Sequence, residues 1–268
     1  MFQPLYVAAT GLNTFEEEMS NITNNLSNSK TVAFKKGRVE KESMYYISKN
    51  FSNYLEDAYD KIVEADNPRR GIESGLGVRV VSTPKDFSQG TIEVTNNPLD
   101  LAINGEGFFQ LKMPDGTIAY TRAGNFHSDD AGNLVDPNGH LVDPPIIFPD
   151  GTTSVLIKTD GTVLVSINNS SDLTEIGQIT LVKFTNPSGL KSLGQNLYLP
   201  TPASGDPIYG IAGQAGFGTI QQSALEQANV DVISEMMRMV MIQRVFDTVT
   251  KAIQSYDQMV SSAIQMKG

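Results

Sequence analysis

The chain has 268 residues, which is enough for one large domain or two modest ones. Its net charge of -10 argues against a nucleic-acid-binding protein, because such a protein needs a basic surface to displace the counterions of the phosphates. The absence of cysteine excludes disulfides and thiolate metal sites.

Near the start, apolar residues recur at alternating steps of three and four, which is the period of a coiled-coil seam. Pro4 suits the first turn of a helix, and we predict a helix from there to about Asn28. The Asn-rich end of this segment has poor helix propensity, so its stability should come from packing. The seam residues are Leu5, Ala8, Leu12, Phe15, Met19, Ile22 and Leu26.

The same segment does not resemble a cleavable secretion signal. Its first twenty residues contain no Lys or Arg, and residues 16–18 are three consecutive glutamates. No stretch elsewhere is apolar and long enough to cross a bilayer. We therefore expect a protein that is either cytoplasmic or exported by a route that does not read such a signal.

Residues 31–85 have the weakest pattern, and we predict an extended arm with one short helix at about residues 54–65. The run Asn-Pro-Arg-Arg-Gly at residues 67–71 is a clear break in regular structure. The arm carries aromatic residues between charges. They either anchor another molecule or cover the protein's own β domain, and the sequence favours neither interpretation. These residues are Tyr45, Tyr46, Phe51, Tyr54 and Tyr59.

From residue 86 to residue 224 the pattern changes to short β-forming runs between tight turns. The Asp-Gly pairs that start at Asp115, Asp150 and Asp160 are typical of hairpins. Many short strands at this spacing predict an antiparallel sandwich or an irregular barrel. The expected strands are residues 108–113, 118–121, 154–158, 162–167, 178–184 and 196–199.

A second long helix is predicted from Asp231, as its N-cap, to about Met266, with Glu235 favoured in its first turn by the helix dipole. It carries a seam of the same period as the first helix. Methionines beside the seam make the helix apolar on more than one face, which indicates more than one partner. The seam residues are Met239, Ile242, Phe246, Val249, Ile253, Tyr256, Val260 and Ala263.

Together these patterns predict an α+β fold. Residues 1–30 and 225–268 would form a terminal helical domain in which the two helices pair as a coiled coil. Residues 31–85 would be the arm, and residues 86–224 a β-rich domain. We expect the helical seams to be assembly surfaces, formed by Leu5, Leu12, Phe15, Met19, Ile22, Leu26, Met239, Ile242, Phe246, Val249, Ile253, Tyr256 and Val260.

An enzyme would need a reactive site, and the sequence offers only weak candidates. His127 and His140 lie in turn-rich segments, and Asp129 and Asp130 follow His127, which could suggest a metal site or an acid–base pair. A polar turn is the better interpretation. No phosphate-binding loop, nucleophile elbow or zinc spacing is present. We therefore predict no catalytic, cofactor or metal site, and no enzyme activity.

Several segments resemble one family of proteins in the expected order along the chain. They are LYVAATGL from residue 5, NITNNLSN from residue 21, NPLDLAINGEGFF from residue 97, AYTRAGNF from residue 119, GLKSLGQNLY from residue 189, and NVDVISEMMRMVMIQRVFDTVTKA from residue 229. With these motifs the chain resembles the flagellar rod and hook-basal-body proteins of bacteria. A distal rod protein is the nearest match, a proximal rod paralogue is the alternative, and a hook protein would be longer.

The resemblance implies a structural protein that is exported unfolded by the flagellar type III apparatus. Its copies would polymerise into a hollow helical tube across the periplasm and transmit torque to the hook. The terminal helices would line the channel, and the β domain would form the outer wall. The implied partners are further copies, proximal rod proteins, the hook protein and the surrounding P and L rings. A β-rich surface adhesin or tail-like binding protein is the alternative from another class.

The chain departs from the family pattern just after the first helix. The family usually has Thr-x-Gly-Phe-Lys, whereas this chain has Ala33 in place of the glycine, between Thr31 and Lys35. Alanine does not reach positive φ as easily as glycine does. Either the turn differs here, or the chain is a divergent paralogue.

Overall fold

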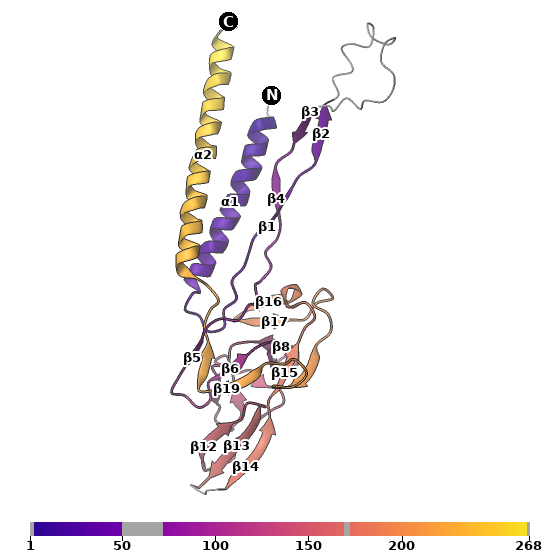
Figure 1. Cartoon of the computed structure of the whole chain (residues 1–268), viewed down its shortest axis with the longest axis vertical. Helices are drawn as coiled ribbons and strands as arrows, with labels where there is room; N and C mark the ends of the chain where they lie inside the picture. The colour runs from indigo at the N-terminus through magenta and orange to yellow at the C-terminus, as the bar shows by residue number, and fades with distance from the viewer. Residues whose placement is uncertain (1–2, 50–71, 169–171, 267–268) are drawn as a thin grey trace, which may run out of the picture. The chain divides into compact units, whose positions relative to one another are not determined.

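The computed structural model describes residues 3–49, 72–168 and 172–266 (Figure 1). These residues form two compact units. The helix unit comprises Met1–Thr23, Arg38–Thr83 and Met236–Gly268, and the β unit comprises Asn24–Gly37 and Pro84–Glu235. The predicted short helix at residues 54–65, the break at residues 67–71 and three of the arm aromatics lie outside the described residues.

Helix α1 spans Gln3–Ser27 and helix α2 spans Val232–Gln265, close to the predicted bounds. The helix unit also contains a two-stranded ribbon. In it, β1 (Glu40–Ser43) pairs with β4 (Val78–Ser82), and β2 (Tyr46–Lys49) pairs with β3 (Ile72–Gly75), both antiparallel. The part of the predicted arm that the structure describes is therefore largely a β-ribbon. Tyr45 and Tyr46 are exposed on it.

The β unit consists of small antiparallel sheets. The largest has the order β16-β17-β8-β7-β11-β10-β9 among the described residues. Its strands are Lys191–Gly194, Leu197–Leu199, Ile118–Thr121, Phe109–Lys112, Leu141–Val142, Leu134–Val135 and His127–Ser128, in that order. A three-stranded sheet contains β12 (Thr152–Ile157), β13 (Thr162–Ile167) and β14 (Leu173–Gln178).

Three isolated strand pairs complete the β unit. The first is β5 (Ile92–Val94) with β20 (Ala224–Glu226), and the second is β6 (Leu101–Asn104) with β19 (Thr219–Gln222). The third is β15 (Thr180–Lys183) with β18 (Ile208–Ile211). A short 3-10 helix, η2, covers Pro187–Gly189. Every strand pair in the described part of the chain is antiparallel, as the hairpin signals predict.

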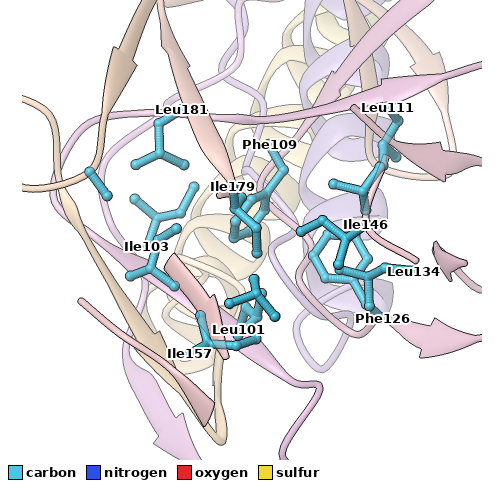
Figure 2. Close-up of a cluster of buried hydrophobic side chains, with 14 of the residues drawn as sticks. Leu101, Ile103, Phe109, Leu111, Phe126, Leu134, Ile146, Ile157, Ile179 and Leu181 are labelled. Atoms are coloured by element: carbon cyan, nitrogen blue, oxygen red, sulfur yellow. The ribbon is translucent and has the colours of Figure 1, made fainter. Parts of the chain in front are cut away.

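The main core of the β unit lies between these sheets (Figure 2). Because side chains alternate along a strand, the adjacent Phe108 and Phe109 enter different clusters. Phe109 packs edge-on against Phe126 in the main core, with ring centroids 5.2 Å apart. Phe108 joins a second, aromatic cluster with Phe184 and Tyr198. The double phenylalanine of the GEGFF motif therefore fills two cores at once.

The predicted α+β class agrees with the structure, but the predicted coiled coil is wrong. Extensive backbone contacts between elements of the described residues are all strand–strand contacts, and α1 and α2 do not pack along a shared seam. They separate toward the two chain termini (Figure 1). Knobs-into-holes packing would hold the helix axes 8–10 Å apart throughout.

The ribbon packs against part of the α1 surface. A Cβ at Gly77 would lie 2.1 Å from Thr10 Oγ1, so the ribbon backbone approaches α1 closely. The amide of Val78 donates a hydrogen bond to Thr10 Oγ1 at 3.4 Å. Lys41 forms an ion pair with Glu18 and lies over the ring of Phe15. The ribbon thus contacts α1 at Thr10, Phe15 and Glu18, of which only Phe15 is a predicted seam residue.

In the turn after α1, an alanine adopts a backbone conformation that glycine reaches most easily. Ala33 has φ of 53°, in the left-handed region, and its side chain is buried. Its N–H donates to the carbonyl oxygen of Glu226 at 2.7 Å, which holds the unfavourable conformation in place. Ala33 thus adopts a backbone conformation that the glycine of the family pattern would reach more easily.

Two substitutions at Ala33 should behave differently. Ala33→Gly relieves left-handed strain of about 1 kcal/mol but loses a buried methyl group worth about 0.8 kcal/mol, so the unfolding free energy should change by less than about 1 kcal/mol. Ala33→Val places a branched side chain at positive φ in a buried site, and should lose at least about 2 kcal/mol. Urea unfolding measures both. Equal losses for the two variants would show that strain at Ala33 is not the cause.

Candidate functional site

The α1 seam faces the interior of the helix unit without being fully covered. Ile22 is buried, and the other seam residues are half-buried. On the opposite side of α1, Asn13, Glu16 and Glu17 are exposed. The predicted helical periodicity therefore separates inner and outer sides correctly. The half-buried residues are Leu5, Ala8, Leu12, Phe15, Met19 and Leu26.

Helix α2 begins where the sequence predicts. The carboxylate of Asp231 accepts a hydrogen bond from the amide of Ile233 at 3.2 Å and one from the hydroxyl of Ser234 at 2.5 Å. The Ser234 hydrogen bond lowers the pKa of Asp231, as expected for a charged N-cap. Among the α2 seam residues from Met239 to Val260, only Ile242 is buried. Met239, Phe246, Val249, Ile253, Tyr256 and Val260 are half-buried.

An open groove of about 960 Å³ lies between the two helices and the ribbon. From α1 it is lined by residues that include Val7, Gly11 and Phe15. Val78 of the ribbon and Val249 and Tyr256 of α2 complete its apolar walls. Predicted seam residues of both helices therefore line one groove, but they do not fill it.

A second apolar surface lies on the first part of α2, and we call it the Met face. Its members recur at steps of three and four, so they share one side of the helix. Their exposed fractions run from 38% to 69%. Arg244 borders the Met face and lines a shallow pocket with four of its members. The Met face consists of Ile233, Met236, Met237, Val240, Met241 and Val245.

A buried ionic cluster joins distant segments of the β unit. Lys35 Nζ lies 2.6 Å from Glu226 Oε1, and Arg122 Nε lies 2.9 Å from Glu226 Oε2. Lys35 also donates to the carbonyl of Ser88, and Arg122 donates to the carbonyls of Gly105 and Gly107. All three charged side chains are almost completely inaccessible to solvent. Burial of charges is tolerated here because each has ionic and backbone partners.

Burial and the neighbouring charges shift the pKa values of Glu226 and Lys35. Burial alone would raise the pKa of its carboxyl, but the charges of Arg122 and Lys35 outweigh burial and hold the pKa below its usual range. Burial lowers the pKa of the Lys35 amine, partly opposed by Glu226. The ionised Glu226 is thus the partner that both cations need.

Two asparagines add to this junction. Asn25 Oδ1 accepts from the amide of Gly37 at 2.9 Å, and its Nδ2 donates to Glu235 at 3.3 Å. Asn229 accepts from the amide of Lys36 at 2.8 Å and donates to the carbonyl of Asp86 at 2.7 Å. Within the β unit, the end of α1 and the start of α2 are therefore linked through side-chain amides.

The stability of the β unit should fall as the pH is lowered through the ordinary glutamate pKa of 4.5. The pKa of Glu226 is lower in the folded chain than in the unfolded chain, so its stabilising effect is present above that pH and is lost below it. Urea unfolding at pH values from neutral to about 3 measures this loss of stability. The near-ultraviolet circular dichroism of the buried Tyr120 and Tyr198 reports the unfolding. Glu226→Gln should make the pH dependence shallower; an unchanged slope would contradict the assignment.

His140 lies in the hairpin turn between β10 and β11, and His127 is the first residue of β9. The Asp136 carboxylate accepts from the amides of Asn138 and His140 and lies 2.9 Å from His140 Nδ1. His127 is exposed, and the nearby Asp129 accepts from the amides of Ala131 and Asn133. No group of three or more acidic or histidine side chains is placed to hold a metal within residues 3–49, 72–168 and 172–266.

Comparison with known proteins relates the sequence of this chain to a family. Residues 102–165 match the model of the flagellar hook protein FlgE/F/G D1 domain, and residues 221–266 match that of the flagellar basal body rod FlgEFG protein C-terminal region. The flagellar basal-body rod protein FlgG of Buchnera aphidicola from Schizaphis graminum is 39% identical, over 99% of this chain and 100% of the relative. FlgG of Borreliella burgdorferi is 38% identical over 100% of this chain and 99% of the relative. FlgG of Caulobacter vibrioides is 36% identical over 99% of this chain and 99% of the relative.

The chain belongs to the FlgG family of flagellar basal-body rod proteins. This FlgG-family chain is a structural subunit of the flagellar rod and is located in the flagellar basal body. The resemblance stated from the sequence motifs is thereby confirmed. None of the helices that the structure describes is long and apolar enough to span a membrane.

Sequence reasoning missed the ionic cluster of this FlgG-family chain. Lys35 and Arg122 stand within or beside the motifs that carry the resemblance, and each follows apolar or aromatic residues closely, which is a weak signal of burial. Glu226 gives no such signal. Residues 35, 122 and 226 are far apart in the chain, so only the folded β unit brings them together.

Proposed function

We propose that copies of this chain polymerise through their terminal helices into the hollow helical tube of the distal rod. The observation that supports this most is the incomplete burial of both helical seams together with the open groove between them. A protein that functions as a single chain gains stability by covering such residues, since full burial of a large apolar side chain contributes about 1.5–3 kcal/mol. The surface that this chain leaves uncovered is available to neighbouring subunits.

The proposed assembly residues are those of the two seams. They are Leu5, Leu12, Phe15, Met19, Ile22, Leu26, Met239, Ile242, Phe246, Val249, Ile253, Tyr256 and Val260. Residues 1–30 and 225–268 would form the inner part of the tube, residues 86–224 its outer part, and residues 31–85 an arm between them. A head-to-tail contact that does not close on itself generates a helical filament, so the interface would be heterologous.

The wider setting of the proposal is the basal body. The chain would leave the cell unfolded through the flagellar export apparatus, order its helices on joining the growing tip, and carry torque to the hook. Proximal rod proteins, the hook protein and the surrounding P and L rings would be its neighbours. The role is mechanical, without catalysis, metal or cofactor.

The test is a charge placed in the seam of the full chain. Phe246→Asp puts a carboxylate into a half-buried apolar site of α2, and should abolish the tubes that we expect the parent to form at high concentration. Gln243→Asp is the matched control, because it adds the same charge to an exposed site on the same helix. Electron microscopy shows the tubes, and thermal unfolding of the β unit should be unchanged in both variants. Ile242→Asp should behave like Phe246→Asp.

Tubes of normal diameter from the Phe246→Asp chain would overturn the proposed role of the seam. Loss of tubes in both variants would show that net charge matters and not the seam. A parent chain that stays monomeric at every concentration, with slowly exchanging amides in both terminal helices, would favour a self-contained binding protein.

A further inference from the structure

We propose that residues 219–229 act as a clasp: strands β6 and β7 and the aromatic cluster of the β unit reach their native form only when this segment docks. The clasp is the last part of the β unit before helix α2. It is distinct from assembly through the helices, because the residues that it holds belong to the β unit. Its consequence for export rests on the proposed function.

The clasp supplies the strand partners of β5 and β6. In the part of the chain that the structure describes, β5 pairs with β20 and β6 pairs with β19, and neither has a second strand neighbour. Leu101, Ala102 and Ile103 of β6 are completely buried. An undocked clasp would leave buried amides and carbonyls of β6 without partners, which is costly. Strand β6 is therefore stable in its buried position only with the clasp in place.

The clasp also carries the anion of the buried ionic cluster. Without Glu226, the side chains of Lys35 and Arg122 would lose the carboxylate oxygens that lie 2.6 Å and 2.9 Å from their nitrogens. Glu226 would in turn be a carboxylate without its two cations. Burial of either side alone is costly, so both sides stay hydrated until they meet. The ionic cluster thus makes docking of the clasp an all-or-none event.

The clasp fits closely against two earlier segments of the β unit. The carbonyl of Glu226 accepts from the amide of Ala33 at 2.7 Å, and its carboxylate accepts from the amide of Gly90 at 2.8 Å. A Cβ at Gly90 would lie 2.0 Å from the carbonyl oxygen of Gln227, so no side chain fits between the two backbones. Closing a loop as long as that between Ala33 and Glu226 is slow and carries an entropic cost.

The clasp further holds a segment on which the aromatic cluster depends. Asn229 Nδ2 donates to the carbonyls of Asp86 and Ser88, at 2.7 Å and 3.1 Å. Between these two residues, Phe87 packs edge-on against Phe108, with ring centroids 5.3 Å apart. Phe108 directly precedes β7. Undocking of the clasp therefore loosens the ring that covers Phe108 and, through it, strand β7.

A chain that leaves the cell unfolded would gain from such a clasp. Because the clasp needs residues 33–36 and 86–91 as partners, neither end of the β unit completes the fold alone. A chain that is still partly inside the export apparatus would therefore stay unfolded. It would fold once both ends of the β unit are free.

Native-state hydrogen exchange of the full chain, as a monomer in low urea, tests the clasp. The amides of β7 belong to the ladders with β8 and β11 and not to the clasp. We expect them to open with the same free energy as the amides of β19 and β20, since β7 opens together with the clasp. Exchange in β19 and β20 while β7 stays protected would overturn the proposal.

Gly90→Ala is the second variant, and Gly177→Ala is its matched control. Gly90→Ala sets a methyl group against the carbonyl of Gln227, so exchange in β7 and in the clasp should rise by the same factor, at least about tenfold. In Gly177→Ala the new Cβ would lie 3.7 Å from Ile146, an ordinary contact, and exchange should stay within about twofold of the parent.

Two results from Gly90→Ala would overturn the clasp: faster exchange in the clasp alone, or exchange like that of the parent throughout. Because exchange is measured on the monomer, neither result depends on the formation of tubes. Failure of the parent to form tubes would count against the assembly function and leave the clasp standing.

Discussion

Glu226→Gln is expected to lower the free energy of unfolding of the β unit by about 3–5 kcal/mol. Glutamine keeps the size and shape of glutamate, so the change removes a charge without creating a cavity. Lys35 and Arg122 would then be two buried cations with no anion between them. Breaking a buried ion pair in this way is far more costly than losing one at the surface.

Urea unfolding followed by circular dichroism measures this loss, and Glu93→Gln is the matched control. Glu93 is exposed and accepts one hydrogen bond from Gln227, so its loss should be below about 1 kcal/mol. Adding Lys35→Met to Glu226→Gln should recover part of the stability, because it removes one stranded cation. Strictly additive effects of the two substitutions would show that Lys35 and Glu226 do not depend on each other.

The effect should reach the turn that follows α1. The carbonyl of Glu226 holds the amide of Ala33, and its side chain holds Lys35 two residues later. Asn229 then binds Lys36. In the Glu226→Gln variant the amide of Ala33 should therefore exchange with solvent faster, while amides in β12 and β13 should change less.

Phe109→Ala should destabilise the β unit by about 3–5 kcal/mol, because it opens a large cavity in the main core. Phe109 lies in β7 and is completely buried among Leu101, Phe126 and Ile179 (Figure 2). Its edge-on contact with Phe126 would be lost together with its burial. The surrounding strands are fixed by their hydrogen bonds, so the cavity can collapse only partly.

Thermal and urea unfolding test this prediction. Phe109→Leu should lose clearly less than Phe109→Ala, because leucine refills much of the space. Val94→Ala serves as the exposed control and should change stability by no more than about 0.5 kcal/mol. A loss below about 1.5 kcal/mol for Phe109→Ala would mean that the core rearranges far more easily than its strand pairing suggests.

Local patterns predicted much of the fold. Strands β8 and β13 begin and end at the predicted residues, since hairpin turns bound them on one side and β-forming residues fill them. Helix α2 starts beside Asp231, because an N-cap acts through hydrogen bonds within one turn. The seam periodicity also identified correctly which residues of each helix face inward.

Non-local contacts decided the rest. The seam pattern predicts that a helix face is apolar but not what covers it. The ribbon that packs on α1 at Thr10 begins more than ten residues after that helix, and no local pattern announces the contact. The left-handed backbone of Ala33 depends on a carbonyl almost two hundred residues away.

The sequence by itself therefore determined where the helices and many of the strands lie, which sides of the helices are apolar, and which family the chain resembles. These properties depend on residues a few positions apart. Only the tertiary structure decided that the helices leave an open groove, and that Lys35, Arg122 and Glu226 meet in the β unit. The physical reason is that close packing and buried charge pairs join segments that are far apart in the chain. Such contacts leave no pattern among neighbouring residues of the sequence.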